Sequence, residues 1–367
     1  MEKLVFEPLD TLFFRDGQPF NRGEGNSGLV SLFPPSPVTM VGAARAAWAR
    51  HQGWNGKGKW KSSIEANLGG NGKELAGLQF SGPLLEIEGE LVVPAPASLI
   101  GVNGDAEPPN HLALLTPGNP MHCDLGDNVR LPCPALPPDD KIEGRKPLKD
   151  WWLTKAGLSQ VLTGGTPDRS AFIHRSRLWV DEPKVGNQIN ETSGTVEEGM
   201  LYSTQHVRLC AETTLAMYLS IEGSSLGHFP AMTRIPLGGE ARSCWLSSQA
   251  AELDLPAAMP TVNKGKIQYT VFILTPLAAS APPRPGKPFE ALPGVVVSAC
   301  VRPSQRWGGW DSIKLEPLPM TSHLAPGSVL FMEADEKEKN SIEGLVGQTI
   351  GQRKSWGFGL ITIGHWT

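Results

Sequence analysis

Glycine and proline recur along the whole of this sequence and limit what it can fold into. The 367 residues include 41 Gly and 33 Pro, so about a fifth of the chain favours turns. Frequent turns leave room for short strands and loops but not for a bundle of long helices. The hydrophobic fraction of 40% is still enough to build sizeable cores, and the length indicates about two domains.

Most segments between these turns have strand composition, rich in β-branched and aromatic residues. Strands are predicted at residues 3–9, 171–180, 201–209, 214–221, 266–275, 295–301, 328–332 and 360–363, and two more at 77–93 around a tight turn at Glu88-Gly89. Helices are predicted at residues 41–51, capped by Ser36 or Thr39, and at residues 148–162, with Trp151 and Trp152 on the inner side. Helices are too few for a doubly wound parallel sheet.

The predicted fold class is therefore α+β, with two ferredoxin-like (RRM-like) domains built on antiparallel sheets, the commonest solution of this kind. The N-terminal domain is expected over residues 1–165, with a Pro-rich insertion at about 94–147. The C-terminal domain is expected over residues 166–367. It carries a hairpin at about 185–199, whose polar, Gly-bearing centre lies between two predicted strands.

The C-terminal segment GQTIGQRKSWGFG, residues 347–359, places glycines beside basic residues, a pattern typical of phosphate-binding loops. A Walker A loop needs Gly before its Lys, but Arg353 precedes Lys354, and a strand rather than a helix is predicted to follow. A dinucleotide-binding fold is excluded because it also needs a helix after the glycine loop. No cofactor is therefore predicted. The simplest interpretation is a glycine-rich turn whose Trp356 and Phe358 enter the core.

Other short stretches also combine cations with polar or glycine residues. In RSAFIHRSR, residues 169–177, strand periodicity places Arg175 and Arg177 on one face and His174 on the other. The pair Gly238-Gly239 lies close to Arg242, and glycines allow a backbone to approach a ligand closely. Several such places in one chain indicate an extended ligand rather than a small one.

Charge and cysteine usage restrict the class of protein. The net charge of −4 argues against nucleic-acid binding by the whole surface, so any such binding needs a local basic groove. Five scattered cysteines without a CxxC pair indicate free thiols in a reducing compartment. Residues His111, His122, Cys123 and Cys133 lack standard zinc spacing, and no metal site is predicted. With no apolar run long enough for a membrane span and no signal-peptide pattern in MEKLVFEPLD, we expect a cytoplasmic protein without a membrane partner.

A series of motifs, in order over nearly the whole chain, resembles the RAMP superfamily of CRISPR proteins. The motifs are FRDGQPF at 14–20, LFPPSP at 32–37, EPKVG at 182–186, GMLY at 199–202, GGE at 238–240, GWD at 309–311, PGSV at 326–329 and the C-terminal glycine loop. More narrowly, the chain is similar to the subunits of the type III-B (Cmr) effector complex that hold the 5′ tag of the CRISPR RNA. Asn187 departs from the Ile usual in that family, and the insertion at 94–147 matches no family feature.

The resemblance implies two ferredoxin-like domains and a structural, non-catalytic role in antiviral defence. It implies binding to the 5′ tag of the CRISPR RNA. It also implies contacts with the large polymerase-like Cmr subunit, the backbone Cmr subunit and other Cmr complex subunits. The hairpin at 185–199 would be the thumb-like element that such subunits press against RNA.

RNA phosphates need cations and backbone N–H donors, and single-stranded bases need stacking or pocket residues. Arg and Lys side chains would supply charge, glycine segments would supply backbone donors, and Ile189 at the hairpin tip would wedge between bases. The predicted RNA contacts are Arg15, Arg45, His174, Arg175, Arg177, Lys184, Asn187, Gln188, Ile189, Gly238, Gly239, Arg242, Gly347, Gly351, Arg353 and Lys354.

Two alternatives to an RNA-binding scaffold stay open on the sequence. One is a metal-independent endoribonuclease that processes CRISPR RNA precursors, with His51 or His174 as general base. No His–His pair is evident, and Tyr, which often assists such cleavage, occurs only three times. The other is a protein-only interaction module that makes no RNA contact.

Overall fold

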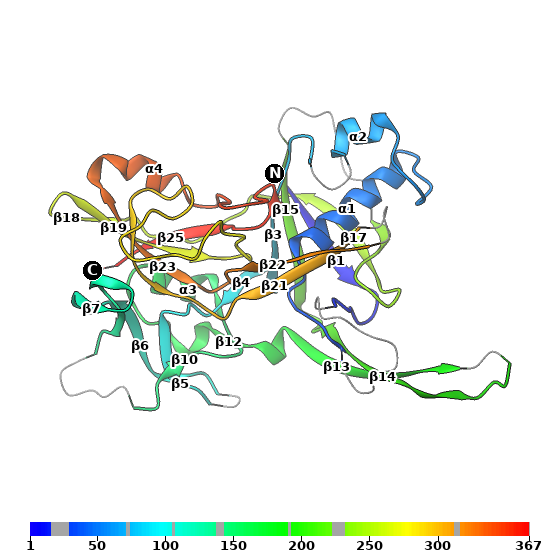
Figure 1. Ribbon diagram of the computed structural model, residues 1–367, viewed down its shortest axis with the longest axis horizontal. Helices are drawn as coiled ribbons and strands as arrows, with labels where there is room; N and C mark the ends of the chain where they lie inside the picture. Colours follow the sequence, from blue (N-terminus) through cyan, green and yellow to red (C-terminus); the bar gives the residue numbers. More distant parts are fainter. Residues whose placement is uncertain are drawn as a thin grey trace.

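The computed structural model describes residues 1–15, 29–70, 74–104, 107–136, 143–189, 192–221, 232–311 and 316–366. Two mainly antiparallel sheets lie next to each other, few helices cover them, and two hairpins extend outward (Figure 1). The predicted α+β class with antiparallel sheets is thereby confirmed. Residues 16–20 of the FRDGQPF motif lie outside the described residues, as do the side chains of Gln188, of residues 197–201 and of Trp310.

The first sheet has nine strands in the order β12-β11-β4-β3-β15-β1-β17-β16, with β24 pairing in parallel to β3. Glu88 and Gly89 join β3 to β4 with positive φ values of 52° and 83°, as a two-residue hairpin turn requires, and this predicted turn is confirmed. The strands are β1 (Glu2–Pro8), β3 (Leu78–Ile87), β4 (Glu90–Pro94), β11 (Trp151–Thr154), β12 (Phe172–His174), β15 (Thr213–Ile221), β16 (Thr233–Pro236), β17 (Ser243–Ala250) and β24 (Trp356–Gly357).

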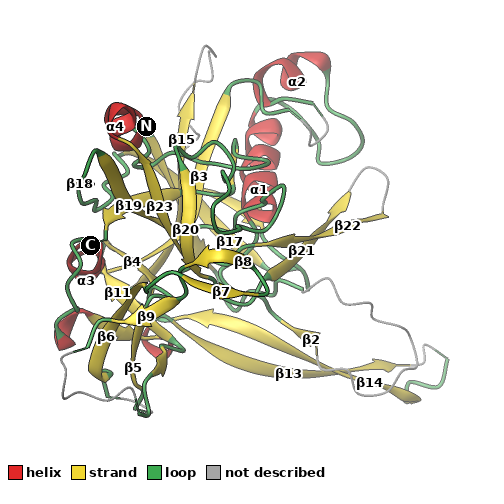
Figure 2. Cartoon of the chain, turned by 60° about the vertical axis from the view of Figure 1, so that its left-hand side comes forward, coloured by secondary structure: helices red, strands yellow, loops and turns green. Residues whose placement is uncertain are grey.

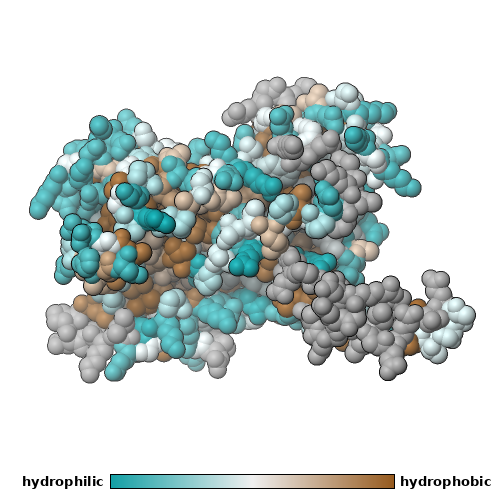
Figure 3. Space-filling model, in the orientation of Figure 1, coloured by the Kyte–Doolittle hydropathy of each residue, from teal (hydrophilic) through white to brown (hydrophobic). Residues whose placement is uncertain are grey.

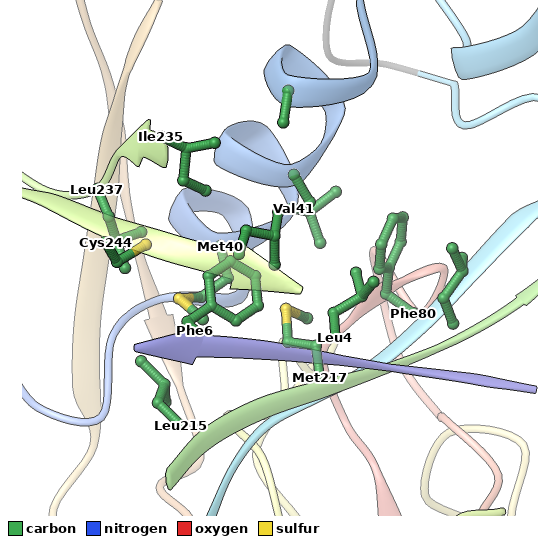
Figure 4. Packing of buried hydrophobic residues seen from close by; sticks show 14 of the residues in the cluster. Leu4, Phe6, Met40, Val41, Phe80, Leu215, Met217, Ile235, Leu237 and Cys244 are labelled. Carbon is green, nitrogen blue, oxygen red and sulfur yellow. The ribbon is translucent and has the colours of Figure 1, made fainter. Parts of the chain in front are cut away.

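Helix α1 (Pro37–His51) covers one face of this sheet. Ser36 is its N-cap residue, and Pro37 at the first helical position supplies a pre-set φ without losing a hydrogen bond. Met40, Val41, Ala44 and Trp48 recur at helical spacing and are buried. Figure 4 shows α1 over the sheet, with the first two of these near side chains of the strands. The short helix α2 (Ser62–Leu68) follows and packs on α1.

The second sheet is built entirely from residues after 260, in the order β20-β23-β19, with both β18 and β25 pairing to β19. Its inward side chains, among them Tyr269, Val271 and Ile363, form a separate apolar core. The strands are β18 (Thr261–Asn263), β19 (Lys266–Ile273), β20 (Val295–Cys300), β23 (Val329–Asp335) and β25 (Ile361–His365), and α4 (Lys339–Glu343) precedes the last of them.

A third apolar core joins the two sheets. It contains Leu84 and Trp151 from the first sheet together with Phe272 and Phe331 from the second. Both faces of the central strands are therefore covered. At the edge of this core, Lys3 pairs with Glu86, which also accepts a hydrogen bond of 3.0 Å from the Tyr218 hydroxyl.

The Pro-rich insertion forms small sheets beside the second sheet (Figure 2). One has the strand order β10-β5-β6-β9, and β7 with β8 forms a separate hairpin. The strands are β5 (Leu99–Val102), β6 (Asn110–Pro117), β7 (Met121–Cys123), β8 (Gly126–Val129), β9 (Pro132–Pro134) and β10 (Lys146–Pro147).

Two hairpins leave the sheets. The longer one, β13 (Trp179–Ile189) with β14 (Val196–Leu209), extends away from the body of the molecule in both views and is joined by β2 (Leu29–Val30) (Figures 1 and 2). Its paired strands are longer than the predicted element at 185–199. The second hairpin consists of β21 (Gln305–Asp311) and β22 (Glu316–His323).

The helix predicted over residues 148–162 is wrong in its first half. Residues Trp151–Thr154 form strand β11, and only Lys155–Leu162 form helix α3, which Thr154 caps by accepting a hydrogen bond from the Gly157 amide. Trp151 faces the core between the sheets and Trp152 faces the core under α1. Neighbouring residues buried on opposite faces are a property of a strand covered on both sides.

The domain boundary predicted between residues 165 and 166 falls within the stretch of chain that builds the first sheet. Strands β12, β15, β16 and β17 follow residue 165 and pair in that sheet, whereas the second sheet begins at β18. The boundary itself stays a prediction.

Candidate nucleic-acid interface

A cavity of about 320 Å³ lies where the long hairpin leaves the first sheet. Phe33, Trp151 and Trp179 contribute aromatic walls, and the ring of Phe33 lies 4.9 Å from that of Trp179. The cavity reaches the second unit, the part of the chain after residue 260 that contains the second sheet, through residues such as Leu274, Arg302 and Gln305. It therefore brings together five parts of the chain: residues 33–35, strands β3 and β4, the start of β11, the hairpin base, and the loops of the second unit.

Arg175 is a cation at this cavity that the sequence predicted. It lies in a short 3-10 turn (Arg175–Arg177), where its guanidinium donates a hydrogen bond of 2.8 Å to Asp181 and lies 3.5 Å from Asp150. Its Cζ is 5.6 Å from the centre of the Trp179 ring. The turn also separates Arg175 from Arg177, which is exposed, so the predicted shared strand face is wrong.

Arg302 is the cation that sequence reasoning missed. Its guanidinium donates to the carbonyls of Ala95 (2.6 Å) and Leu148 (3.2 Å), and burial lowers its pKa. Its Nε is buried and has no hydrogen-bond partner among the described residues. A Cβ at Gly327 would lie 2.7 Å from that Nε, so the glycine of the PGSV motif makes room for the arginine. The PGSV motif is visible in the sequence, but nothing there links it to Arg302.

A cluster of charged side chains lies along the hairpin beyond the cavity. Arg208 donates to Glu182 (2.7 Å) and to Asp10 (2.9 Å), and Arg242 donates to Asp10 (3.0 Å). Lys184 lies 3.4 Å from Glu182 and 3.7 Å from Asp10. The hydrogen bond from Arg208 lowers the pKa of both carboxyl groups, which are exposed enough that solvent screens these pairs. Two of the predicted cations, Lys184 and Arg242, are thus partly neutralised.

A series of hydrogen bonds between mostly buried side chains lies next to this cluster and supports it. Lys184 Nζ donates to Thr11 Oγ1 at 2.9 Å, and Thr11 Oγ1 lies 3.1 Å from His206 Nδ1. His206 is buried, stacks on Phe13 and lies 3.1 Å from Thr204 through Nε2. Burial lowers the pKa of His206, and the neighbouring charges of Arg242 and Lys184 lower it further. A neutral histidine therefore links the hairpin to the chain after β1.

Gly238 and Gly239 lie at the surface next to this cluster, but they serve the fold. A Cβ at Gly238, whose φ is 81°, would lie 2.4 Å from the Phe13 carbonyl oxygen. The Gly239 amide donates to that same oxygen at 2.8 Å. The N–H predicted to bind phosphate is therefore already bonded within the protein.

The far part of the long hairpin carries exposed apolar side chains. Val185, Ile189 and Val196 have exposed fractions of 71%, 59% and 55%. Asn187 lies on β13 with Val185 and Ile189 and is also exposed. An exposed apolar tip fits the predicted wedge between bases, which stays a prediction.

The C-terminal glycine loop presents Arg353 and Lys354 to solvent at the edge of a shallow groove of about 780 Å³. Gly351 and Arg353 both have positive φ, of 79° and 54°. The Gly347 amide donates to the Ile361 carbonyl, so it is not a free donor. Trp356 and Phe358 are buried, which confirms that they anchor this loop in the core.

Arg45 is the clearest correction among the predicted RNA contacts. Only 4% of it is exposed, and it donates to the carbonyls of Leu68 (2.9 Å) and Gly69 (2.7 Å). Burial lowers its pKa to about 10. Its position on the inner side of α1 follows from helical spacing with Val41 and Trp48. Arg15 is exposed beside Ser31, with which it forms an isolated bridge.

The candidate catalytic histidines of the nuclease alternative belong to different elements. His51 ends α1, and His174 ends β12, where its Nδ1 lies 2.8 Å from the Ser176 hydroxyl. Within the described ranges, no three His, Cys, Asp or Glu side chains gather as a metal site would require. No helix in the same ranges is long and apolar enough to cross a membrane.

The comparisons with known proteins point to one family. The family model described as CRISPR-associated protein (Cas_Cmr3) matches residues 4–366. A chain in the cryo-EM structure of the Type III-B Cmr-beta bound to cognate target RNA matches with a TM-score of 0.50 and 15% identity, covering 98% of this chain and 96% of that one. A chain in the corresponding structure with target RNA and AMPPnP, state 1, gives 0.48 and 14%, covering 94% and 88%. No curated protein matches the sequence.

Proposed function

Because this chain belongs to the Cas_Cmr3 family of CRISPR-associated proteins, we propose that it is a non-catalytic, RNA-binding subunit of a type III-B (Cmr) effector complex. In this role it holds the 5′ tag of the CRISPR RNA in the cytoplasm. It links the large polymerase-like subunit to the backbone filament and contacts other Cmr subunits. The resemblance that the ordered motifs indicated is thus confirmed for the family, and the RNA role is the proposal.

The observation that carries this proposal is the cavity at the hairpin base. Single-stranded RNA is bound where aromatic rings stack on bases and cations meet phosphates. The cavity offers the rings of Trp151 and Trp179, the guanidinium group of Arg302 and that of Arg175, which Asp181 and Asp150 partly neutralise. The hairpin beside it presents the exposed Ile189 to a strand of RNA that leaves the cavity.

The strand order supports the finer fold assignment, two ferredoxin-like units. In the first sheet, β3-β15-β1-β17 are neighbours, and α1 lies between β1 and β3 in the chain. In the second sheet, β20-β23-β19-β25 are neighbours in the same relative order. We propose that each is a ferredoxin-like β-α-β-β-α-β unit with shortened or replaced helices.

The test compares binding of two RNAs to the full-length chain by fluorescence anisotropy: a CRISPR RNA with its 5′ tag and the same RNA with the tag sequence scrambled. Wild-type protein should prefer the tagged RNA. Arg175→Gln should weaken tagged-RNA binding roughly tenfold, since it removes a charge-assisted contact of about 1.5 kcal/mol or more. The control Arg284→Gln changes an exposed arginine in a loop of the second unit and should bind normally.

Two outcomes would contradict the proposal. Equal affinity of wild-type protein for both RNAs, or an equal loss of tagged-RNA affinity in Arg175→Gln and Arg284→Gln, would show that the tag does not bind in this cavity. Specific cleavage of a precursor RNA in the presence of EDTA, lost in His174→Ala, would show an endoribonuclease instead.

A further inference from the structure

The segment from the last two residues of α1 to the start of α2 concentrates positive charge in an otherwise acidic protein. Residues 50–61, RHQGWNGKGKWK, contain one Arg and three Lys without a single Asp or Glu, although the whole chain has a net charge of −4. We call residues 50–61 the Lys-Trp loop. The side chains of Arg50, Lys57, Lys59 and Lys61 are all exposed. None of them is part of the RNA site described above.

Within the described part of the chain, these cations differ from those of the hairpin cluster in having no carboxylate partner. Lys184, Arg208 and Arg242 each pair with Asp10 or Glu182. Among the residues that the structure describes, no carboxylate forms an ion pair with Lys57, Lys59 or Lys61. Their charge is therefore available to an external anion.

Two tryptophans give the loop a defined shape. Trp54 Nε1 donates to the Lys57 carbonyl at 2.9 Å, and the rings of Trp54 and Trp60 meet edge to face with centroids 6.1 Å apart. The Arg50 guanidinium lies over Trp54 at 5.6 Å. Gly53, Gly56 and Gly58 all have positive φ, a conformation that the tight course of the loop needs. The lysines are thus carried on an ordered turn, not on a free tail.

The Lys-Trp loop connects to the C-terminal glycine loop through Arg45. The buried guanidinium of Arg45 lies 4.9 Å from the centre of Trp60 and 5.4 Å from the centre of Trp356. Trp356 also lines the shallow groove that Arg353 and Lys354 border, together with one acidic residue, Glu74. Figure 3 shows mostly hydrophilic side chains around α2, next to this region.

We infer that the Lys-Trp loop and the C-terminal glycine loop form a second RNA-binding surface, which contacts the backbone of a single strand without reading its sequence. Six exposed cations, one carboxylate and two partly exposed indoles match the composition of surfaces that track single-stranded nucleic acid. This inference extends the proposed function to a second contact, away from the tag cavity. The strand is either the CRISPR RNA beyond its tag or the target RNA, both of which offer the same phosphate backbone.

The binding test uses an oligouridylate of about 16 nucleotides, within the range that such surfaces cover, and the full-length chain. The loop variant Lys57→Gln/Lys59→Gln/Lys61→Gln should weaken binding and reduce the slope of log affinity against log salt by about 2, since three phosphate contacts are lost. The matched control Lys287→Gln/Lys337→Gln/Lys339→Gln makes the same change in net charge on the second unit, where these lysines are also exposed, and should keep the slope.

The outcomes separate this surface from the tag site. Equal salt slopes for the loop variant and its control would overturn the inference. So would a loop variant that binds RNA normally but no longer assembles with its partner subunits, because the loop would then bind a protein rather than RNA. The loop variant should retain the preference for tagged over scrambled RNA. If wild-type protein lacks that preference but the loop variant lowers the slope, the tag proposal fails and the surface stands.

In the assembled complex, ultraviolet crosslinking to Trp54 and Trp60 then identifies the strand. Labelled guide and labelled target are used in separate reactions. Crosslinks to either strand support the surface, and crosslinks to neither contradict it.

Discussion

The guanidinium of Arg45 is held between two indoles, with 5.4 Å between its Cζ and the ring centre of Trp356. Trp60 provides the second ring, at 4.9 Å. One arginine of α1 thereby fixes both the loop before α2 and a segment close to the end of the chain. The basic surface inferred above depends on this internal contact.

Arg45→Ala should therefore destabilise the protein. It removes two cation–π contacts and leaves the Leu68 and Gly69 carbonyls without their donor, so the free energy of unfolding should fall by about 3 kcal/mol. Urea denaturation measures this change. The control Arg50→Ala, on the exposed end of the same helix, should cost less than about 1 kcal/mol. Equal losses in the two variants would contradict the packing role of Arg45.

Glu86→Ala should be among the most damaging single changes in the first sheet. It leaves the buried ammonium of Lys3 unpaired, which costs about 3–5 kcal/mol of unfolding free energy. Glu86→Gln keeps an acceptor for the Tyr218 hydroxyl, so its loss of unfolding free energy should lie between zero and that of Glu86→Ala. Glu90→Ala, exposed just beyond the turn, provides the control and should change stability by less than about 0.5 kcal/mol. Wild-type stability in Glu86→Gln would show that the ion pair contributes nothing.

The stability of the protein should decrease as the pH falls below about 6.5. Burial lowers the pKa of both His206 and His323, so between the folded and unfolded pKa values the unfolded chain binds more protons. Denaturant titrations at a series of pH values measure the slope. His206→Gln should flatten it, whereas His51→Gln, at an exposed site, should not. A pH-independent stability in wild-type protein would contradict this account.

Asp10→Asn should increase sequence-independent RNA binding. Asp10 pairs with Lys184, Arg208 and Arg242, and its neutralisation releases positive charge at the hairpin base. The salt slope should steepen by about 0.7 for each cation that becomes free to bind phosphate. Asp127→Asn makes the same charge change on the insertion, where Asp127 contacts His122, and should have little effect. Identical slopes in the two variants would mean that only net charge matters.

Arg353→Asn/Lys354→Gln should reduce the salt slope of RNA binding by about 1.4, the value for two phosphate contacts on a single strand. Asn is chosen because it tolerates the positive φ of residue 353. Arg284→Gln/Lys287→Gln serves as the control with equal charge. An unchanged slope in the glycine-loop variant would leave this loop with a purely structural role.

Most of the strands could be predicted because strand composition and turn residues are properties of short segments. The turn at Glu88-Gly89, the start of helix α1 at Pro37 and the burial of Trp356 and Phe358 follow from turn chemistry, the proline at the first helical position and composition. The failure at residues 148–162 has a physical cause. Trp151 and Trp152 are buried on opposite faces of one strand, and a short apolar run of this kind looks the same in a buried helix.

The candidate site was less accessible from the sequence. Arg175 was predicted to contact RNA, but its neighbour Arg302 was not, because more than a hundred residues separate them and only the packing of the two sheets brings both to one cavity. Tertiary contacts around α1 and the first sheet likewise bury Arg45 and bond the Gly239 amide to the Phe13 carbonyl.

The sequence by itself determined the α+β class, the ordered motifs that resemble one CRISPR protein family and the positions of its basic stretches. It did so because turn residues, strand composition and motif order are properties of neighbouring residues. The tertiary structure alone decided which cations stay available. Lys184 meets Asp10 across the hairpin base, whereas Lys57, Lys59 and Lys61 meet no described carboxylate. That difference depends on distant strands brought together by the cores, since a charge is neutralised only by what packs beside it.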